Sequence, residues 1–375
     1  MGWGGLRRGR IFKWGVYVKD MVSRRIIVKW GLVGLFGAAA FSFCNHDDDF
    51  KKVNPPQRVN LDGVLSKVND FIPISTPEDF DKIRANLNGN YVLTRDLDFS
   101  DQPNFEPLGN FENGFNGVFN GNGYLISGVR IEHPKREYVS LWKLVNKGST
   151  ICNLELKDIR VNASAYGSVL VSKNRGNVVN CHVFDSSVYT KDVAGGLVSE
   201  NLGLVQNSSY SGRLNSGFMI GGAVAINRKD MIGITTKVHI NGGNDIGGLV
   251  GLSYSGRIFD SRAIVDIQGE ESIGGGIGVL NYNSVIQGVR TSGKIKRTGF
   301  CIGGVVGSND GGIVEDCCSS IQGYPIIGKI YEKASFENYY HHYKDYYNNP
   351  KGLEESRHQE VLGCKLEDSR CIKLK

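Results

Sequence analysis

Two aspartates, Asp158 and Asp185, have the spacing that best fits acid–base chemistry or cation binding. They are separated by one period of the repeat that is described below. If one period forms one coil of a stacked structure, the two carboxylates lie about 5 Å apart. That separation suits a retaining glycosidase pair or two calcium ligands. The alternative, which we favour, is a pair of solvated turn residues whose charges are relieved by Lys157 and Arg160.

Established catalytic and cofactor motifs do not occur in the chain. His341, His342 and His358 are not part of an HExxH string, and no G-x-S-x-G, P-loop or dinucleotide-binding fingerprint stands at a strand–helix junction. The spacings of Cys and His do not suggest zinc. The sequence therefore predicts no catalytic residues, no metal site and no cofactor.

A tyrosine-rich segment near the C-terminus offers a second candidate ligand site. Residues 331–347 contain six tyrosines, among them Tyr339, Tyr340, Tyr346 and Tyr347. Such aromatic rings can stack on sugars or contact a partner protein. They can equally pack as a cap over the end of a repeat array, and this is the interpretation that we favour.

Glycine pairs recur at a nearly fixed period through the middle of the chain. Glycine makes up 50 of 375 residues. The first glycines of five pairs stand at positions 195, 221, 247, 274 and 303, and a degenerate copy begins at Gly167. The predicted corner glycines are Gly195, Gly196, Gly221, Gly222, Gly247, Gly248, Gly274, Gly275, Gly303 and Gly304.

Each glycine pair is followed by short segments in which apolar and polar residues alternate, the period-2 pattern of strands. A period of about 27 residues is too short for a propeller blade and fits one coil of three short strands and three turns. We therefore expect an all-β, single-stranded β-helix (β-solenoid) of about seven coils over residues 132–320. Glycines would serve the corners, where neighbouring backbones stack closely.

The flanking segments are expected to cover the open ends of the stack. Residues 72–131 would form an N-terminal cap and first coil. Within them, Thr76 and Pro77 predict the start of a short helix, Phe80 lies on its apolar face, and Gly89 predicts its end. Residues 321–375 lose the period and are expected to form a C-terminal cap.

The positive charge of the chain is concentrated in its first residues. Residues 1–43 contain eight Lys and Arg and one acid, so their net charge is +7. The whole chain has a net charge of +6, so the remaining residues together carry −1. The body therefore lacks the basic character typical of nucleic-acid binding. An uninterrupted apolar run at residues 30–43, preceded by Arg24, Arg25 and Lys29, resembles an export signal.

Two processing sites compete within residues 1–44. The signal is either cleaved after the small-residue stretch ending at Ala40, or Cys44 is lipidated, although Phe43 makes a poor lipobox. An uncleaved membrane anchor is the remaining alternative, and translation starts at either Met1 or Met21. Residues 45–71 are expected to be a linker.

Three elements of the sequence resemble bacterial surface and secreted proteins that carry the GLUG motif. They are residues 247–251 with their sister copies, the upstream segment 74–98, and residues 115–128. This family includes adhesin-like proteins and non-catalytic regions of immunoglobulin-A-cleaving metallopeptidases. The resemblance implies an exported β-helix, and its motif carries no catalytic residues. This chain is shorter than the large adhesins.

These features lead to the hypothesis of an exported, non-enzymatic β-solenoid that acts in adhesion or interaction. Its partner would be a protein or glycan on a host or neighbouring cell. Contact with the membrane would come through the signal or a lipid anchor only, and nucleic acid is not expected. The alternatives are a polysaccharide-degrading β-helix enzyme and a structural spacer without its own ligand.

Overall fold

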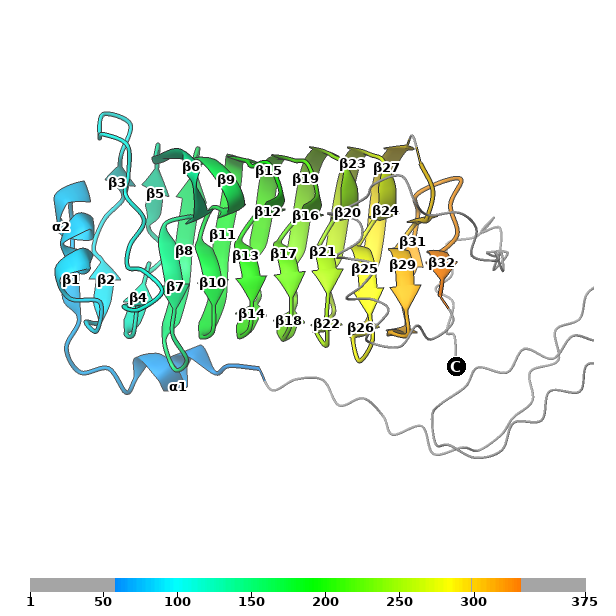
Figure 1. Ribbon diagram of the computed structural model, residues 1–375. Helices are drawn as coiled ribbons and strands as arrows, with labels where there is room; N and C mark the ends of the chain where they lie inside the picture. Colours follow the sequence, from blue (N-terminus) through cyan, green and yellow to red (C-terminus); the bar gives the residue numbers. More distant parts are fainter. Residues whose placement is uncertain (1–57, 298, 332–375) are drawn as a thin grey trace, which may run out of the picture. The chain divides into compact units, whose positions relative to one another are not determined.

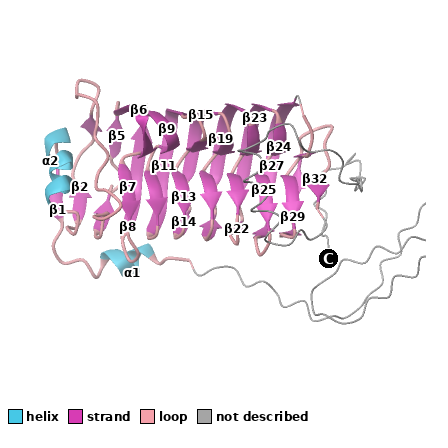
Figure 2. Ribbon diagram, viewed as in Figure 1, coloured by secondary structure: helices cyan, strands magenta, loops and turns pink. Residues whose placement is uncertain are grey.

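The predicted β-solenoid is confirmed by a computed structural model, which describes residues 58–297 and 299–331. Strands of successive coils lie side by side along the stack (Figures 1 and 2). Every pair of neighbouring named strands is parallel, as in Leu204–Gln206 beside Asp230–Ile232. The helices are few and lie at the N-terminal end and along one edge.

Each coil contains four strands rather than the predicted three. One complete coil runs through β13 (Val198–Asn201), β14 (Leu204–Gln206), β15 (Ser209–Ser216) and β16 (Met219–Gly221). The strand missed from the sequence is the fourth, which ends on the first glycine of the next pair. It is very short and shows no alternation of apolar and polar residues, so in the sequence it cannot be distinguished from the glycine corner that follows it.

Four rows of stacked strands result, and we name them the front sheet, the short row, the wide face and the closing row. The front sheet is an eight-stranded sheet of its own, and the other three rows belong to one continuous sheet. The front sheet consists of β7 (Trp142–Val145), β10 (Val171–Asn174), β13, β17 (Val224–Asn227), β21 (Val250–Ser253), β25 (Ile277–Asn281), β29 (Val306–Asp310) and β32 (Ile327–Ile330).

The short row and the wide face meet at a corner, and two long strands, β8 (Thr150–Lys157) and β11 (Asn177–Tyr189), continue around it. The short row also contains β1 (Ile72–Ile74), β2 (Tyr91–Leu93), β4 (Val118–Asn120), β14, β18 (Asp230–Ile232), β22 (Arg257–Phe259), β26 (Val285–Gln287) and β30 (Ile313–Glu315).

The wide face has the longest strands, and the closing row leads from it back to the front sheet. The wide face also contains β3 (Leu97–Asp98), β5 (Leu125–Ser127), β6 (Arg130–Val139), β9 (Arg160–Ser168), β15, β19 (Thr235–Gly242), β23 (Arg262–Gly269), β27 (Arg290–Arg297) and β31 (Cys318–Ser319). The closing row contains β12 (Val193–Gly195), β16, β20 (Asn244–Gly247), β24 (Glu271–Gly274) and β28 (Ile302–Gly303).

The register of the closing row follows the glycine period read from the sequence. Gly195 pairs with Gly221, Gly221 with Gly247, Gly247 with Gly274, and Gly274 with Gly303. Each pairing joins equivalent residues of adjacent coils. The intervals between these glycines are therefore the lengths of successive coils.

The degenerate copy at Gly167 is one residue out of the predicted alignment. Gly195 pairs with Ser168, and Gly167 pairs with Ala194. Ser168 can take the glycine position because its hydroxyl donates a 2.8 Å hydrogen bond to the carbonyl oxygen of Val171 in the same corner.

Close backbone approach, rather than a left-handed conformation, explains the corner glycines. None of the ten has a positive φ. A Cβ atom at Gly222 would overlap the carbonyl oxygen of Gly248 in the next coil, and one at Gly221 would overlap that of Val224. At these two positions the corner and the next coil leave no room for a side chain.

The interior is one continuous apolar core with a column of buried asparagines at one corner. Along β19, buried and exposed side chains alternate strictly from Thr235 to Asn241. At the ends of front-sheet strands, Asn174 Nδ2 donates to Asn201 Oδ1 and Asn201 Nδ2 donates to Asn227 Oδ1, each at 2.9 Å. All three asparagines are fully buried. Their bonds satisfy polar groups that would be costly to bury alone.

The N-terminal end of the stack is covered by α2 (Pro77–Asp81), as predicted from Thr76 and Pro77. The Thr76 side chain accepts a 3.1 Å hydrogen bond from the backbone of Asp79, and Pro77 opens the helix. Phe80 is fully buried, with ring centroids of four core aromatic residues 5.6–5.8 Å away. It thus closes the end of the core.

This helix ends earlier than the sequence pattern predicts. After α2 the chain continues as a 3-10 helix over Lys82–Ala85, and Gly89 lies beyond it in a turn, with its N–H donating to the carbonyl oxygen of Asn86 at 3.2 Å. Gly89 therefore does not terminate the helix. Its missing side chain makes room for the ring of Tyr91, which a Cβ atom would overlap.

Residues 58–71, expected to belong to a linker, form a strap along the short row. The strap contains α1 (Leu61–Leu65), and its apolar side chains pack on Val118, Cys152 and Val179 of successive coils. Its first residues reach the coil of β22, where Arg58 pairs with Asp260 at 3.2 Å. In Figure 1 the strap lies below the stack.

The stack continues past residue 320 into the segment expected to be a C-terminal cap. Strand β32 pairs with β29 in parallel and adds an eighth strand to the front sheet. The period cannot be recognised in the sequence there, because the coil from β29 to β32 is shorter than the earlier coils and has no glycine pair in the closing row.

Several predictions fall outside the described residues. These are the export signal, cleavage at Ala40, lipidation of Cys44, and the aromatic residues Tyr339, Tyr340, Tyr346 and Tyr347. Within residues 58–297 and 299–331, no helix has the length and apolar character needed to cross a membrane.

The asparagine column predicts a large effect of one substitution. Asn201→Ala would leave the buried amides of Asn174 and Asn227 with fewer partners and is expected to lower the free energy of unfolding by about 2–3 kcal/mol. Denaturant unfolding followed by circular dichroism measures this. Asn215→Ala, on the exposed side of β15, is the control and should cost less than about 0.5 kcal/mol. Equal, small losses in both variants would show that the column does not stabilise the stack.

Candidate functional site

The two aspartates of the predicted carboxylate pair occupy equivalent turns of adjacent coils. Both have a left-handed backbone with φ of 51°. Asp158 is bound by Arg130 at 3.1 Å and by Arg160 at 3.5 Å, so its charge is compensated. Asp185 is exposed and has no ion pair among the described residues. The Lys157 ammonium, expected to relieve this charge, lies 5.9 Å from the centre of the Phe184 ring instead.

No third carboxylate, histidine or cysteine of the described residues joins this pair to complete a cation site. Across residues 58–297 and 299–331, no group of three or more such side chains could hold a metal ion. The pair as it stands offers one carboxylate held by arginines and one open to solvent.

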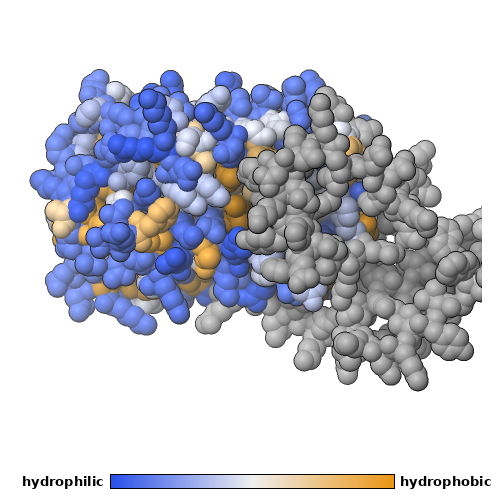
Figure 3. Space-filling model, viewed as in Figure 1, coloured by the Kyte–Doolittle hydropathy of each residue, from blue (hydrophilic) through white to orange (hydrophobic). Residues whose placement is uncertain are grey.

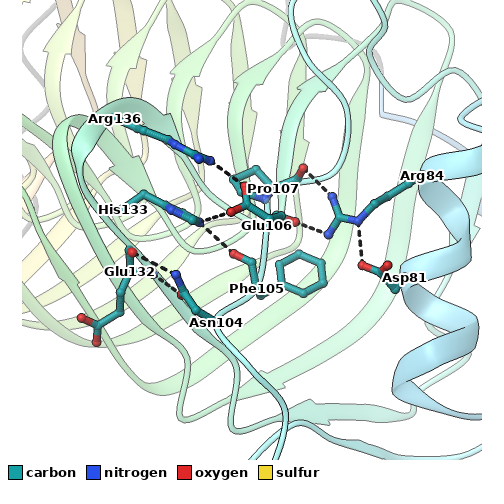
Figure 4. Close-up of polar contacts among 9 residues, drawn as sticks. All are labelled: Asp81, Arg84, Asn104, Phe105, Glu106, Pro107, Glu132, His133 and Arg136. Atoms are coloured by element: carbon teal, nitrogen blue, oxygen red, sulfur yellow. Dashed lines mark hydrogen bonds and ion pairs between the residues drawn. The ribbon is translucent and has the colours of Figure 1, made fainter.

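A cluster of titratable side chains lies beside the N-terminal cap (Figure 4). Glu106 forms a 2.6 Å ion pair with Arg136 and lies 3.6 Å from Nε2 of His133. The same nitrogen is 3.0 Å from the carbonyl oxygen of Phe105. His133 is almost fully buried, and the carbonyl oxygen of Phe105 is the hydrogen-bond partner of its ring.

Further contacts in this cluster join the cap to the first coils. Arg84 pairs with Asp81 at 2.6 Å and donates to the carbonyl oxygens of Glu106 and Pro107. Asn104 exchanges two hydrogen bonds, of 2.7 and 3.0 Å, with the backbone of Glu132 (Figure 4). Each member already has a partner, so the cluster fastens the cap. This cluster was not predicted from the sequence, although Asn104 and Glu132 are separated by one coil length.

One carboxyl group has a strongly perturbed environment in the closing row. The pKa of Asp245 is raised to about 7, mainly because burial removes water from the carboxyl group and to a smaller extent because the charge of Glu271 is near. A hydrogen bond from Ser272 lowers the pKa, but its effect is weaker. Asp245 has a left-handed backbone with φ of 50°. It aligns with Ser272 of the next coil because the flanking residues Asn244 and Ile246 pair with Glu271 and Ile273. Ser272 in turn aligns with Cys301 of the following coil, because Ile273 pairs with Ile302, and Cys301 Sγ lies 3.8 Å from the hydroxyl oxygen of Tyr331.

The outer side of the wide face carries a strong excess of positive charge. Strands β15, β19, β23 and β27 contain seven Lys and Arg and a single acid, Asp266. We call the exposed basic side chains of these strands the wide-face patch. Its members are Arg213, Lys237, Arg262, Arg290, Lys294 and Lys296.

Like charges are stacked directly within this patch. Arg262 and Arg290 are paired in register on adjacent strands, about 4.8 Å apart along the stack. The one acid is shared, since Asp266 lies 3.1 Å from Lys294 and 3.2 Å from His239. Like charges directly opposite one another destabilise a sheet. The face is therefore chemically suited to bind an acidic partner that relieves this repulsion.

Hydrophilic residues also dominate the upper and lower edges of the described surface in the front view, and hydrophobic residues appear mainly in a band between them (Figure 3).

Comparison with known proteins gives limited similarity. No family model matches the chain, so the likeness to GLUG-motif proteins stands on the residues quoted above. A candidate Gly-rich membrane protein of Evansella cellulosilytica is 28% identical over 203 residues, which cover 52% of this chain. The match covers 21% of that relative, so this chain spans about a fifth of the relative's length.

Two solved structures resemble the chain in backbone arrangement. One is a candidate immunoglobulin A1 protease from Bacteroides ovatus, with a TM-score of 0.47 and 15% identity, covering 61% of this chain and 77% of that one. The other is an IgA1 protease chain, with a TM-score of 0.45 and 17% identity, covering 69% of this chain and 21% of that one. At these identities neither likeness carries information on activity.

The raised pKa of Asp245 predicts a pH-dependent stability. The carboxyl holds its proton to about pH 7 in the folded chain and releases it near pH 4 when unfolded, so stability falls as pH rises from about 4 to 7. Asp245→Asn removes this loss and tolerates the left-handed backbone. Its melting temperature should exceed that of the wild type at pH 8, with the difference shrinking towards pH 4.

Asp185→Asn is the matched control, because Asp185 has the same left-handed backbone and is exposed. Thermal melts at pH 4, 6 and 8 compare the three proteins. A constant offset between Asp245→Asn and wild type across this range would contradict the assignment.

Proposed function

We propose that this chain is an exported, non-enzymatic β-solenoid that acts in adhesion or interaction at or near a bacterial surface. The observation that carries the proposal is the wide-face patch. It is a broad, exposed array of basic side chains, and no described element covers it. The backbone that carries these side chains is fixed in a sheet, so binding of an extended partner has to order the side chains but not the backbone. The partner is a protein or glycan with an acidic surface.

Export is supported by the sequence of the leader. The cationic segment followed by an apolar run resembles a secretion signal. The Evansella relative, which matches half of this chain, is described by its name as a membrane protein. Attachment through lipidated Cys44, release after cleavage at Ala40 and retention by an uncleaved membrane anchor are the three routes consistent with the leader.

A polysaccharide-degrading enzyme is the second candidate, and the observation that favours it is the alignment of Asp158 and Asp185 in adjacent coils. A general acid and a nucleophile about 5 Å apart is the arrangement of a retaining glycosidase. Against this, Asp158 is already engaged by Arg130 and Arg160. The third possibility, a spacer without its own ligand, does not account for the charge excess on the wide face.

Removing charge from the wide-face patch should weaken binding to cells. We expect the triple variant Lys237→Gln/Arg262→Gln/Lys294→Gln of the full chain to bind at least about tenfold more weakly than wild type, because long-range attraction and charge pairing are both lost. Flow cytometry of fluorescent protein on bacterial and epithelial cells measures this. The control, Lys67→Gln/Arg95→Gln/Lys191→Gln, removes three exposed charges elsewhere and should bind as wild type.

Unchanged cell binding by the wide-face variant would refute the role of this surface. Release of reducing sugars from a glycan by the wild type, abolished in Asp158→Ala/Asp185→Ala, would establish the enzyme instead.

Surface location is tested on intact cells. Protease added from outside should degrade the body of the chain, and radiolabelled lipid should enter the wild type but not Cys44→Ala if the cysteine route operates. Label absent from both proteins, with a mature N-terminus after Ala40, identifies the secreted route. Full protection of the body from protease would contradict the export assignment.

A further inference from the structure

A groove of about 660 Å³ lies where the start of the strap passes over the turns that follow the front-sheet strands. Arg58, Lys147, Arg175, Lys229 and Asp230 supply its charged walls. The groove lies between the front sheet and the short row, and the wide-face patch belongs to a different row of strands. It is thus a separate surface of the solenoid.

Three of the four cations in the groove have no compensating charge. Arg58 is held by Asp260 at 3.2 Å, and the single acid, Asp230, is held by Arg257 through bonds of 2.7 and 2.8 Å. The exposed side chains of Lys147, Arg175 and Lys229 form no ion pair among the described residues. The groove therefore presents a net positive charge although the chain beyond residue 43 is almost neutral.

These three cations are arranged in a row along the solenoid axis. Lys147 and Arg175 belong to adjacent coils, since Val145 pairs with Asn174. Lys229 lies two coils further on, since Asn174 pairs with Asn201 and Asn201 with Asn227. At about 4.8 Å per coil the row extends about 14 Å. Charges spread in a line suit a linear anion rather than a single phosphate ion.

The turns that carry these cations are held by the buried asparagine column. Asn174 Oδ1 accepts from the backbone of Gly176 at 3.1 Å, next to Arg175. Asn227 Nδ2 donates to the carbonyl oxygen of Lys229 at 3.0 Å, and Asn201 Nδ2 donates to that of Asp230 at 3.3 Å. The backbone of each turn is fixed before a ligand arrives, which lowers the cost of binding.

We propose that this groove binds an anionic polysaccharide strand, bearing carboxylate or sulfate groups, that runs parallel to the solenoid axis. No aromatic side chain lines the groove. Single-stranded nucleic acids are bound mainly by stacking bases on aromatic rings, so the lining favours a glycan over a nucleic acid. The inference rests on the proposed export only in that an exported chain encounters such polymers.

Binding of defined polymers by the full chain tests this inference. The probes are polygalacturonate for carboxylate, dextran sulfate for sulfate, neutral dextran, and a single-stranded thymidine oligonucleotide. Lys147→Gln/Arg175→Gln/Lys229→Gln should bind at least one anionic polysaccharide about tenfold more weakly than wild type, and the dependence of log affinity on log salt should decrease by about two to three. The variant should keep the wild-type melting temperature, because all three side chains are exposed.

The variant Lys67→Gln/Arg95→Gln/Lys191→Gln, which removes three exposed charges outside the groove and outside the wide-face patch, serves as the matched control and should bind the polymers within about twofold of wild type. Equal affinity of wild type and groove variant for both anionic polymers would overturn the inference. So would tighter binding of the oligonucleotide than of either polymer, which would identify a nucleic-acid site. Loss of polymer binding in the groove variant with cell binding retained supports the inference independently. Polymer binding without any binding to cells would instead refute the proposed function alone.

Discussion

Parallel stacking in register is the constraint on which the rest of this structure depends. Each residue of a coil lies about 4.8 Å from its counterpart in the next coil, so side chains at equivalent positions of successive coils meet directly. Asparagine benefits, because its amide both donates and accepts, and Asn174, Asn201 and Asn227 form a continuous bonded column. Glycine is required where carbonyl oxygens of the next coil approach too closely, as at Gly222. Stacked arginines such as Arg262 and Arg290 repel one another.

The same constraint explains how much could be predicted from the sequence. The coil length and the alignment of Gly195 with Gly221 could be predicted, because a stacked structure requires the same residue types at a fixed interval along the chain. The cap helix was accessible because Thr76 and Pro77 act locally. Its end was mispredicted, because the α-helix passes after Asp81 into a 3-10 helix that ends at Ala85, before the glycine is reached.

What escaped prediction depends on contacts between segments far apart in the chain. The strap has no periodic pattern of its own, and its position is set by the apolar surface of Val118, Cys152 and Val179. The contact of His133 with Phe105 likewise joins residues one coil apart without a repeated motif. Net charge was the least informative quantity. The near-neutral body consists of basic surfaces and acidic segments that cancel in the sum, and only the fold shows where each lies.

The strap also determines how the molecule would respond to a mechanical load. It runs against the direction in which the coils succeed one another, from the coil of Asp260 back to the first strand. A pull on the chain before Arg58 is therefore transmitted along the side of the stack and loads many contacts in shear. The first coil and its cap, which would otherwise peel off one strand at a time, are shielded until the strap detaches. A tether at the N-terminal side thus holds the solenoid through its middle coils.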